Sequence, residues 1–397
     1  MKRRDFIKTS GLVSAMGLLP GFLHPLKTLA AGSIQKHLVV VQLSGGNDGL
    51  NTIVPFRNDI YYRERPVIGL KGQQLIKVSD ELAFNAAAKG MVELMEKGWL
   101  TVVNGVGYPN PNRSHFRSLD IWQSAAAADQ YLPTGWLGRY LDNSCGKQSQ
   151  VIQTGGGLDL AMKGEERKGL AIEQLRQFNE AWGRPLQKRL YQQLQEEHLG
   201  EDNLGYLYKT FADTMSSHEY INERLSQKVQ TPDFGNSDLS RQLALIGKMM
   251  QAEIDAPVYY ASTSGFDTHA GQQKTQERLW KQTSQALLEF SEYLNKSNLL
   301  ENTLIMVFSE FGRRVSQNAS QGTDHGTAGN LYLISKNLPQ AGFYNELPSL
   351  SDLDANGDLK YSVDFRSVYR SVLEDWLKSQ DQVIKDAKVK RLKNLIV

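Results

Sequence analysis

The feature that most constrains the fold is an apolar run that ends abruptly in a glycine-rich turn. The run Leu38–Leu43 contains three valines, and the sequence Ser-Gly-Gly-Asn-Asp-Gly follows it. A short apolar run bounded by glycine predicts a strand that is buried on both faces, as in a parallel sheet. In open α/β sheets, ligands bind beyond the carboxyl ends of the strands. Asp48 lies in this position, so it is a candidate site residue, although aspartate next to glycine is also typical of a plain turn.

Strand-like and helix-like segments alternate along much of the chain, which predicts an α/β fold with a mostly parallel sheet. Further strands are predicted at Leu100–Val106, Gln150–Gln153, Pro257–Ser262, Thr303–Phe308 and Asn330–Ile334. Helices are predicted at Asn85–Lys97, Arg117–Ala127, Gln273–Asn295 and Asp364–Leu377. Residues from about 165 to 252 are instead rich in Gln, Glu, Lys, Arg and Leu. We interpret them as a helical insertion, because no apolar heptad persists over three repeats as a coiled coil requires.

The length and charge of the chain limit the class of protein. Its 397 residues suit one large α/β domain or two domains. The formal net charge is +2, but residues 1–31 hold five basic residues and one acidic residue, which leaves a net charge of −2 on residues 32–397. No charge bias therefore favours binding to nucleic acid or to an anionic membrane. Cys145 is the only cysteine, so neither an intramolecular disulfide nor a thiolate zinc cluster is expected.

The N-terminus has the pattern of a twin-arginine export signal. Arg3 and Arg4 precede Phe6, an apolar segment spans about residues 11–23, and Ala30 and Ala31 offer a cleavage site. The apolar segment is too short for a stable membrane span. We therefore expect a signal peptide at residues 1–31 and one mature domain at residues 32–397. The expected partner is the twin-arginine export machinery, and the expected location is the periplasm or another exported compartment.

Polar residues that can bind a cation or an anion follow several of the predicted strands. These residues are Asp48, Ser114, His115, Asp267, His269, Glu310, Arg313, Asp324 and His325. Carboxylate and imidazole together suit zinc, manganese or iron, whereas calcium and magnesium prefer oxygen ligands alone. Because each group follows an apparent strand, we expect the groups to converge in one cleft and to form a metal site.

Several of these groups also have a simpler structural interpretation. Asp267 and His269 could cap the helix that follows them, and serine before a helix, as at Ser114, is commonly an N-cap. Glu310 and Arg313 could form a surface ion pair that contributes little to stability. Their shared position after strands is what favours a functional site over these alternatives.

Two other patterns give little support for a ligand. Asp352–Asp358 matches the first half of a calcium loop, but its twelfth position would be Val363 and not the glutamate that such a loop requires. We interpret Asn356–Gly357 as a hairpin turn, with calcium binding as a minor alternative. The run Gly155–Gly157 lacks the lysine and hydroxyl residue of a P-loop, so it does not indicate nucleotide binding.

Taken together, several segments resemble the domain-of-unknown-function family 1501, which is placed in the alkaline phosphatase and sulfatase superfamily. The resemblance covers nearly the whole mature chain. Besides the twin-arginine start, it rests on Leu43–Thr52, Asn112–Phe116, Gly265–His269, Phe308–Arg314, Gly322–Gly329 and Val363–Tyr369. It implies an alkaline phosphatase-like three-layer α/β sandwich around a mostly parallel central sheet, with a helical insertion.

The resemblance also implies roles for individual residues. Ser114 takes the position of the nucleophile, and the implied metal ligands are Asp48, Asp267, His269 and His325. Glu310 stands where the superfamily has the aspartate of an Asp-His pair, and Phe311, which cannot bind a metal, replaces the histidine. Three alternatives follow: Asp324 supplies the missing ligand, only one metal binds, or catalysis has been lost.

These expectations define one main function and one alternative. The main expectation is an exported hydrolase of phosphate or sulfate esters, with an anionic ester as substrate and a zinc, manganese, calcium or magnesium ion as cofactor. Ser114 would attack phosphorus or sulfur, and the cation, with Arg113 or Arg313, would neutralise charge on the equatorial oxygens. His115 or His325 would protonate the leaving oxygen. The alternative is a non-catalytic exported protein that keeps the fold and binds an anion or a glycan.

Overall fold

The first predicted strand, β1 (His37–Leu43), lies in the middle of the central sheet. The structure is a computed structural model that describes residues 35–144, 150–196, 203–226, 229, 231–379, 383–386 and 388–397. The expected signal peptide and Cys145 lie outside the described residues. Lys36–Val397 form one compact unit, and every residue of β1 is buried within it.

The six predicted strands belong to a mixed, mostly parallel sheet, which has nine strands within the described ranges. Besides β1, these are β5 (Leu100–Gly107), β6 (Val151–Thr154), β7 (Leu170–Ile172), β8 (Val258–Thr263), β9 (Thr303–Phe308), β10 (Gly329–Ile334), β11 (Gly342–Phe343) and β12 (Val363–Asp364). β1 pairs in parallel with β8 and β9, and β6 and β7 extend the parallel part beyond β8. β10 lies between β9 and β5 and is antiparallel to both.

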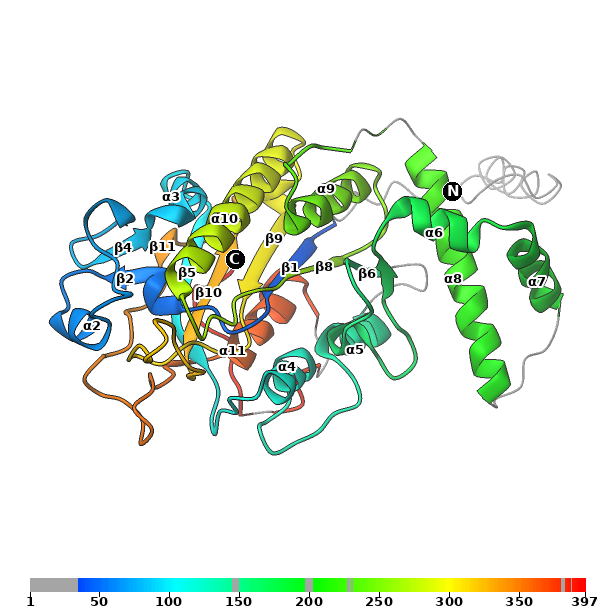
Figure 1. Ribbon diagram of the computed structural model, residues 1–397. Coiled ribbons are helices and arrows are strands. Elements are labelled where there is room, and N and C mark those ends of the chain that lie inside the picture. Colours follow the sequence, from blue (N-terminus) through cyan, green and yellow to red (C-terminus); the bar gives the residue numbers. More distant parts are fainter. Residues whose placement is uncertain are drawn as a thin grey trace, which may run out of the picture. The chain divides into compact units, whose positions relative to one another are not determined.

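Helices cover both faces of this sheet and produce three layers (Figure 1). One layer contains α3 (Lys89–Glu96), α9 (Asp238–Gln251) and α10 (Gln272–Lys296). The other contains α4 (His115–Ser124), α5 (Trp136–Ser144) and α11 (Phe365–Ser371), which continues as a π-helix over Val372–Trp376. Alternate residues of β1 face opposite layers, because side chains of a strand alternate: Val39 packs in one core and Val40 in the other. The predicted three-layer α/β fold is confirmed.

The stretch predicted as a helical insertion, about residues 165–252, is mostly helical where it is described. It contains α6 (Leu175–Trp182), α7 (Pro185–Glu196), α8 (Asn203–Ser226) and α9. However, β7 near its start forms an edge of the central sheet, and the buried residues of α9 belong to the central core. Both ends of the stretch are thus part of the three-layer fold.

A small antiparallel sheet lies outside the central one. It is formed by β2 (Ile53–Pro55), β3 (Leu75–Lys77) and β4 (Leu82–Asn85), and α2 (Asp59–Glu64) follows β2 in the chain. Val54 of β2 and Tyr61 of α2 share a third hydrophobic core. Among the described residues, no helix combines the length and the apolar character needed to cross a membrane.

The strand directions bring the candidate residues to one edge of the sheet. β1, β5, β8 and β9 all run the same way, so the loops after their carboxyl ends lie at a common edge. These loops lead to Asp48, His115, Asp267 and Glu310. β10 runs the opposite way and begins at this edge, so the loop that carries Asp324 and His325 has both of its ends there.

Candidate metal centre

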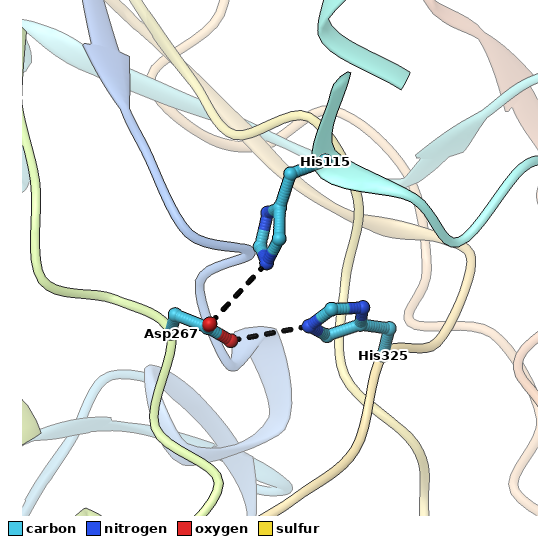
Figure 2. Close-up of side chains that lie close together, drawn as sticks. All are labelled: His115, Asp267 and His325. Carbon is cyan, nitrogen blue, oxygen red and sulfur yellow. Dashed lines mark hydrogen bonds and ion pairs between the residues drawn. The ribbon is translucent and has the colours of Figure 1, made fainter. Parts of the chain in front are cut away.

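Three imidazole rings converge on the carboxylate of Asp267. His115 Nε2 lies 3.4 Å from Asp267 Oδ2, whereas His269 Nε2 and His325 Nε2 lie 3.0 and 3.1 Å from Oδ1. Figure 2 shows that the rings of His115 and His325 both point toward this carboxylate. Ligand atoms of His115, Asp267 and His325 all lie within 4.8 Å of one another, so these residues form a group that could hold a metal ion.

The other nitrogen of each ring, Nδ1, is hydrogen-bonded to a carboxylate or carbonyl oxygen, which accepts. The acceptors are Glu310 Oε1 for His115 (2.9 Å), Asp324 Oδ1 for His269 (2.9 Å) and the carbonyl oxygen of Arg113 for His325 (2.7 Å). A neutral imidazole with its proton on Nδ1 has a lone pair on Nε2. In this neutral tautomer, all three Nε2 atoms direct lone pairs toward an anionic carboxylate, whereas a proton on Nε2 lets a ring donate to it, as in the 3.1 Å contact of His325 with Asp267 Oδ1. Metal-bound histidines are commonly held in this way.

This arrangement calls for a cation among the converging atoms. His269 Nε2 and His325 Nε2 lie 2.9 Å apart, where two lone pairs repel unless a proton or a metal ion lies between them. His115 Nε2 is buried and has no hydrogen-bond partner among the described residues. In a tetrahedral zinc site, ligand atoms at about 2.0–2.1 Å from the metal lie about 3.3 Å apart. The 3.4 Å between His115 and Asp267 is close to this value, whereas the contacts of His269 and His325 with Asp267 and with each other, at 2.9–3.1 Å, are shorter. The donor types of His115, Asp267 and His325 fit a metal ion.

The charge states of Asp267 and His325 also suit a metal. Partial burial acts to raise the pKa of Asp267, but hydrogen bonds from Arg313 and His325 outweigh it and lower the pKa to about 2. Burial lowers the pKa of His325, which favours the neutral ring. The hydrogen bond to Glu310 instead raises the pKa of His115, which favours the protonated ring, so a metal ion bound there would displace this proton. An ionised carboxylate and neutral imidazoles are the forms that bind a metal ion.

Replacing Glu310 by glutamine should lower the pKa of His115 in the metal-free protein. The hydrogen bond to the Glu310 carboxylate raises this pKa, and a neutral amide stabilises imidazolium less than a carboxylate does. A proton–nitrogen NMR titration of chelator-treated protein measures the change. His37 is an internal control, because its Nδ1 contacts the carbonyl oxygen of Ala256 and not the site. An unchanged pKa of His115 would contradict the pairing.

The His115–Glu310 pair should make the free energy of unfolding of the metal-free protein depend on pH. Because the pKa of His115 is raised in the folded state, its interaction with Glu310 contributes fully to the free energy of unfolding below the unfolded value of about 6.5. The contribution is lost as the pH rises through the folded value. The difference in free energy of unfolding between the wild type and Glu310→Gln should therefore shrink over this interval.

Arg313 holds the loops of the site together. Its side chain is fully buried, and within the described residues it donates hydrogen bonds to the carbonyl oxygens of Gly45, Gly46, Phe266 and Thr323 and to Asp267 Oδ1. These acceptors belong to the loops after β1, β8 and β9, so one guanidinium fixes three loops. The geometry favours this positioning role over the direct catalytic role predicted from the sequence.

Glu310 and Asp324, which were predicted as metal ligands, each accept a hydrogen bond from a histidine that lies next to Asp267. Glu310 is fully buried and accepts hydrogen bonds from His115 Nδ1 and from the backbone N–H of Gly45 at 2.8 Å. Asp324 accepts from His269 Nδ1 and from Asn318 Nδ2 at 3.1 Å. Each carboxylate thus accepts from Nδ1 of a histidine, and the Nε2 atom of the same ring faces Asp267. Conversely, His115, which was predicted as a catalytic residue, lies among the ligand atoms.

Ser114, the predicted nucleophile, is exposed and precedes His115 at the start of α4. It occupies the N-cap position, but its side chain makes no capping hydrogen bond. Its backbone N–H donates to Asn112 Oδ1 at 2.8 Å, which fixes the preceding turn. The hydroxyl group of Ser114 therefore does not act as a helix cap, which was the alternative interpretation of this serine.

Asp48 lies outside the group of converging ligand atoms. Its fully buried carboxylate forms an ion pair with Arg65 Nη1 at 2.6 Å and accepts a hydrogen bond from Gln272 Nε2 at 2.5 Å. Asp48 Oδ1 also caps a short 3-10 helix through the N–H of Asn51. A guanidinium thus neutralises the carboxylate that was predicted to bind a metal. No sequence signal separates Arg65 from the exposed Arg63 two residues earlier.

Phe311 forms an apolar wall of the site. Its ring centroid lies 4.9 Å from that of His115 and 4.7 Å from that of His325. Gly46 has a φ of +75°, and a Cβ atom at this residue would lie only 2.2 Å from Phe311 Cε2. The glycine after β1 is therefore required both by its backbone conformation and by the close approach of this ring. Phe311 packs against two ligands, although it cannot be one.

The segment with a partial calcium pattern is a hairpin whose acidic residue binds arginine. Asp354 Oδ1 accepts hydrogen bonds from the N–H groups of Asn356 and Asp358, in agreement with the predicted turn. Asp358 is fully buried, and its carboxylate binds Arg113 and Arg314. Because the carbonyl oxygen of Arg113 anchors His325, this ion pair supports the candidate metal group from outside. The sequence reasoning missed this role.

Comparisons with known proteins give a family and a set of solved structures. The sulfatase PsFucS1 from Pseudoalteromonas sp. is 13% identical, with a TM-score of 0.40 over 99% of this chain and 75% of that chain. A protein of the alkaline phosphatase superfamily from Vibrio parahaemolyticus is 12% identical, with a TM-score of 0.37 over 78% and 62%. A mutant of the alkaline phosphatase PafA is 13% identical, with a TM-score of 0.32 over 70% and 64%.

This chain thus spans less than two thirds of the last two proteins. No curated protein sequence matches it. The profile of the family described as "Protein of unknown function (DUF1501)" matches residues 102–335, which are more than half of the chain and include most of the candidate site. As the resemblance implied, this protein belongs to the DUF1501 family.

Proposed function

We propose that this protein is an exported, metal-dependent hydrolase of phosphate or sulfate esters. The observation that carries the proposal is the convergence of His115, His269 and His325 on the carboxylate of Asp267. A divalent ion bound there would supply Lewis-acid activation of an ester oxygen and of a nearby hydroxyl group. Two imidazoles and one carboxylate, as in the group His115, Asp267 and His325, favour zinc or manganese over calcium and magnesium, which prefer oxygen ligands.

The residues around this group supply the other requirements of ester hydrolysis. Ser114 offers an exposed hydroxyl group at the N-terminus of α4, where the helix dipole favours an anion. Its Oγ would lose its proton to solvent and form a bond to phosphorus or sulfur as the bond to the leaving oxygen breaks, and the leaving oxygen would take a proton from solvent. Water would then attack phosphorus or sulfur and break the bond to Oγ, which regains a proton as phosphate or sulfate is released. His115, Asp267 and His325 would bind the metal ion, and Arg313 keeps the loops of the site in place. This proposal assigns His115 to metal binding and not to proton transfer.

Ser114→Ala should reduce turnover roughly 1,000-fold or more, since a covalent mechanism depends on its nucleophile. The zinc or manganese content should not change, because the serine is not among the converging ligand atoms. The assay compares an aryl phosphate monoester, an aryl phosphate diester and an aryl sulfate, with Ser226→Ala on α8 as a matched control. Unchanged turnover in Ser114→Ala would exclude the serine mechanism.

The alternative is a non-catalytic exported protein that binds an anion or a glycan through the same edge of the sheet. The observation that supports this alternative is that Phe311 stands where the resemblance implies a metal-binding histidine. It predicts a folded protein with no bound metal and no turnover of any of the three esters. The proposed hydrolase predicts about one metal ion per chain together with turnover of at least one of them. Export remains part of the proposal in both cases.

A further inference from the structure

A cavity of about 630 Å³ lies next to the candidate metal centre. Its walls come from α2, from the loop after β9 and from the hairpin that contains Asn356. A volume of this size is in the range of ligand-binding pockets. Apart from Asp324 and Asn318, which form hydrogen bonds with His269, the described residues that line the cavity form no hydrogen bond with the converging histidines.

Asp324 and Asn318 connect the cavity to the metal centre. Both line the cavity, and Asn318 Nδ2 donates to Asp324 Oδ1 at 3.1 Å and to the carbonyl oxygen of His269 at 2.9 Å. Asp324 in turn accepts from His269 Nδ1. One wall of the cavity is therefore the outer side of the metal centre. The cavity and the candidate metal centre thus adjoin at Asp324 and Asn318.

The arginine side chains that line the cavity each form an ion pair with a carboxylate. Arg63 Nε donates to Glu64 Oε1 at 3.2 Å, and Glu64 Oε2 accepts from Ser316 at 2.6 Å. Arg314 Nε donates to Asp358 Oδ1 at 3.2 Å. The side chains of Arg63 and Arg314 are still 68% and 41% exposed, so part of each guanidinium remains open to a ligand.

These groups discriminate among classes of ligand. An anionic ligand would meet the carboxylates of Glu64 and Asp324, and a cationic one would meet two guanidinium groups. A purely apolar ligand would cover charged groups without replacing their hydrogen bonds to water, at a cost in free energy. A hydroxyl group both donates and accepts, so it can bind to guanidinium and carboxylate alike. Leu350 and Leu353 add apolar surface against which C–H groups can pack.

We propose that this cavity binds a neutral, hydroxyl-rich group, namely a sugar residue that carries the ester cleaved at the metal centre. This inference rests on the proposed function and narrows its substrate to esters of carbohydrates. Arg63 and Arg314 donate to sugar hydroxyl groups, and Asp324 accepts from them. Arg63 and Ser351 then determine specificity without taking part in the reaction.

The test compares esters that have the same reacting group. With zinc- or manganese-loaded protein, kcat/KM is measured for a panel of hexose 6-phosphates and 6-sulfates and for ethyl phosphate and ethyl sulfate. At least one sugar ester should be preferred about 10-fold or more. Arg63→Ala and Ser351→Trp, which fills the rim of the cavity, should remove most of this preference and leave kcat/KM for the ethyl esters unchanged. Arg176→Ala, in the exposed pair with Glu180, is the matched control.

Failure of this inference differs from failure of the proposed function. Equal cleavage of sugar and ethyl esters overturns the inference and leaves the hydrolase standing. If no ester is cleaved, saturation-transfer NMR with a panel of methyl hexosides tests the cavity directly. Binding to the wild type that Ser351→Trp abolishes supports a sugar site in a protein without this activity. The absence of binding, or binding that Ser351→Trp does not change, overturns it.

Discussion

Asp267→Asn is expected to abolish metal binding while the protein stays folded. Asp267 is the residue on which three imidazole nitrogens converge, at 3.0–3.4 Å. An amide keeps an oxygen that can accept the hydrogen bond from Arg313, so the contact that fixes the loop survives. It has no negative charge to neutralise a divalent ion, and the affinity should fall more than about 100-fold, beyond the loss that outer-sphere changes cause.

Elemental analysis after dialysis against zinc or manganese measures this effect. The wild type should hold about one ion per chain, and Asp267→Asn should hold almost none, with an unchanged circular dichroism spectrum. Asp352→Asn is the matched control, because this acid is 71% exposed and pairs only with Lys360 among the described residues. Full metal content in Asp267→Asn would show that the ion, if present, binds elsewhere.

Arg65→Met should destabilise the fold by about 3–5 kcal/mol, the usual cost of breaking a buried ion pair. Both partners of the Arg65–Asp48 pair have fully buried side chains. The guanidinium also donates to Asn51 Oδ1 at 2.7 Å and to the carbonyl oxygens of Arg314 and Val315 at 2.8 Å. Methionine fills a similar volume but leaves the Asp48 carboxylate buried without a countercharge. Urea unfolding followed by circular dichroism measures the loss.

Two further variants separate charge from packing. Arg63→Met, two residues away on α2 and 68% exposed, should change the free energy of unfolding by less than about 1 kcal/mol. Asp48→Asn combined with Arg65→Met should recover part of the loss, because the double variant buries no unpaired charge. Asp48→Asn alone should retain the full metal content. A loss of metal in this single variant would restore Asp48 as a ligand.

The core strands could be predicted from the sequence because each is an apolar run between polar breaks. β9 has the predicted bounds, Thr303–Phe308, and β1 and β5 are each one residue longer at one end than expected. The direction of β10 could not be predicted, because an apolar run has the same appearance in a parallel and an antiparallel pairing. β7 has only three residues, too few for a periodic pattern, so it was absorbed into the helical insertion.

The site could be predicted in its members but not in their roles. Asp267, His269 and His325 were expected to share a cleft because each follows a strand, and the structure brings them together. A carboxylate that binds a metal and one that orients a histidine have the same chemistry, so Glu310 could be placed only by its distance to His115. The partner of this contact lies 195 residues away in the chain.

The antiparallel direction of β10 has a consequence for how such a site can diversify. The loop between β9 and β10 leaves and re-enters the sheet at the same edge, on two adjacent strands. Its length can therefore change by insertion or deletion without moving any strand, and doubling a flexible loop costs only about 0.6 kcal/mol in closure entropy. Residues for new substrates could accumulate in this loop while the pairing of the two strands, and with it the position of Glu310, is inherited unchanged.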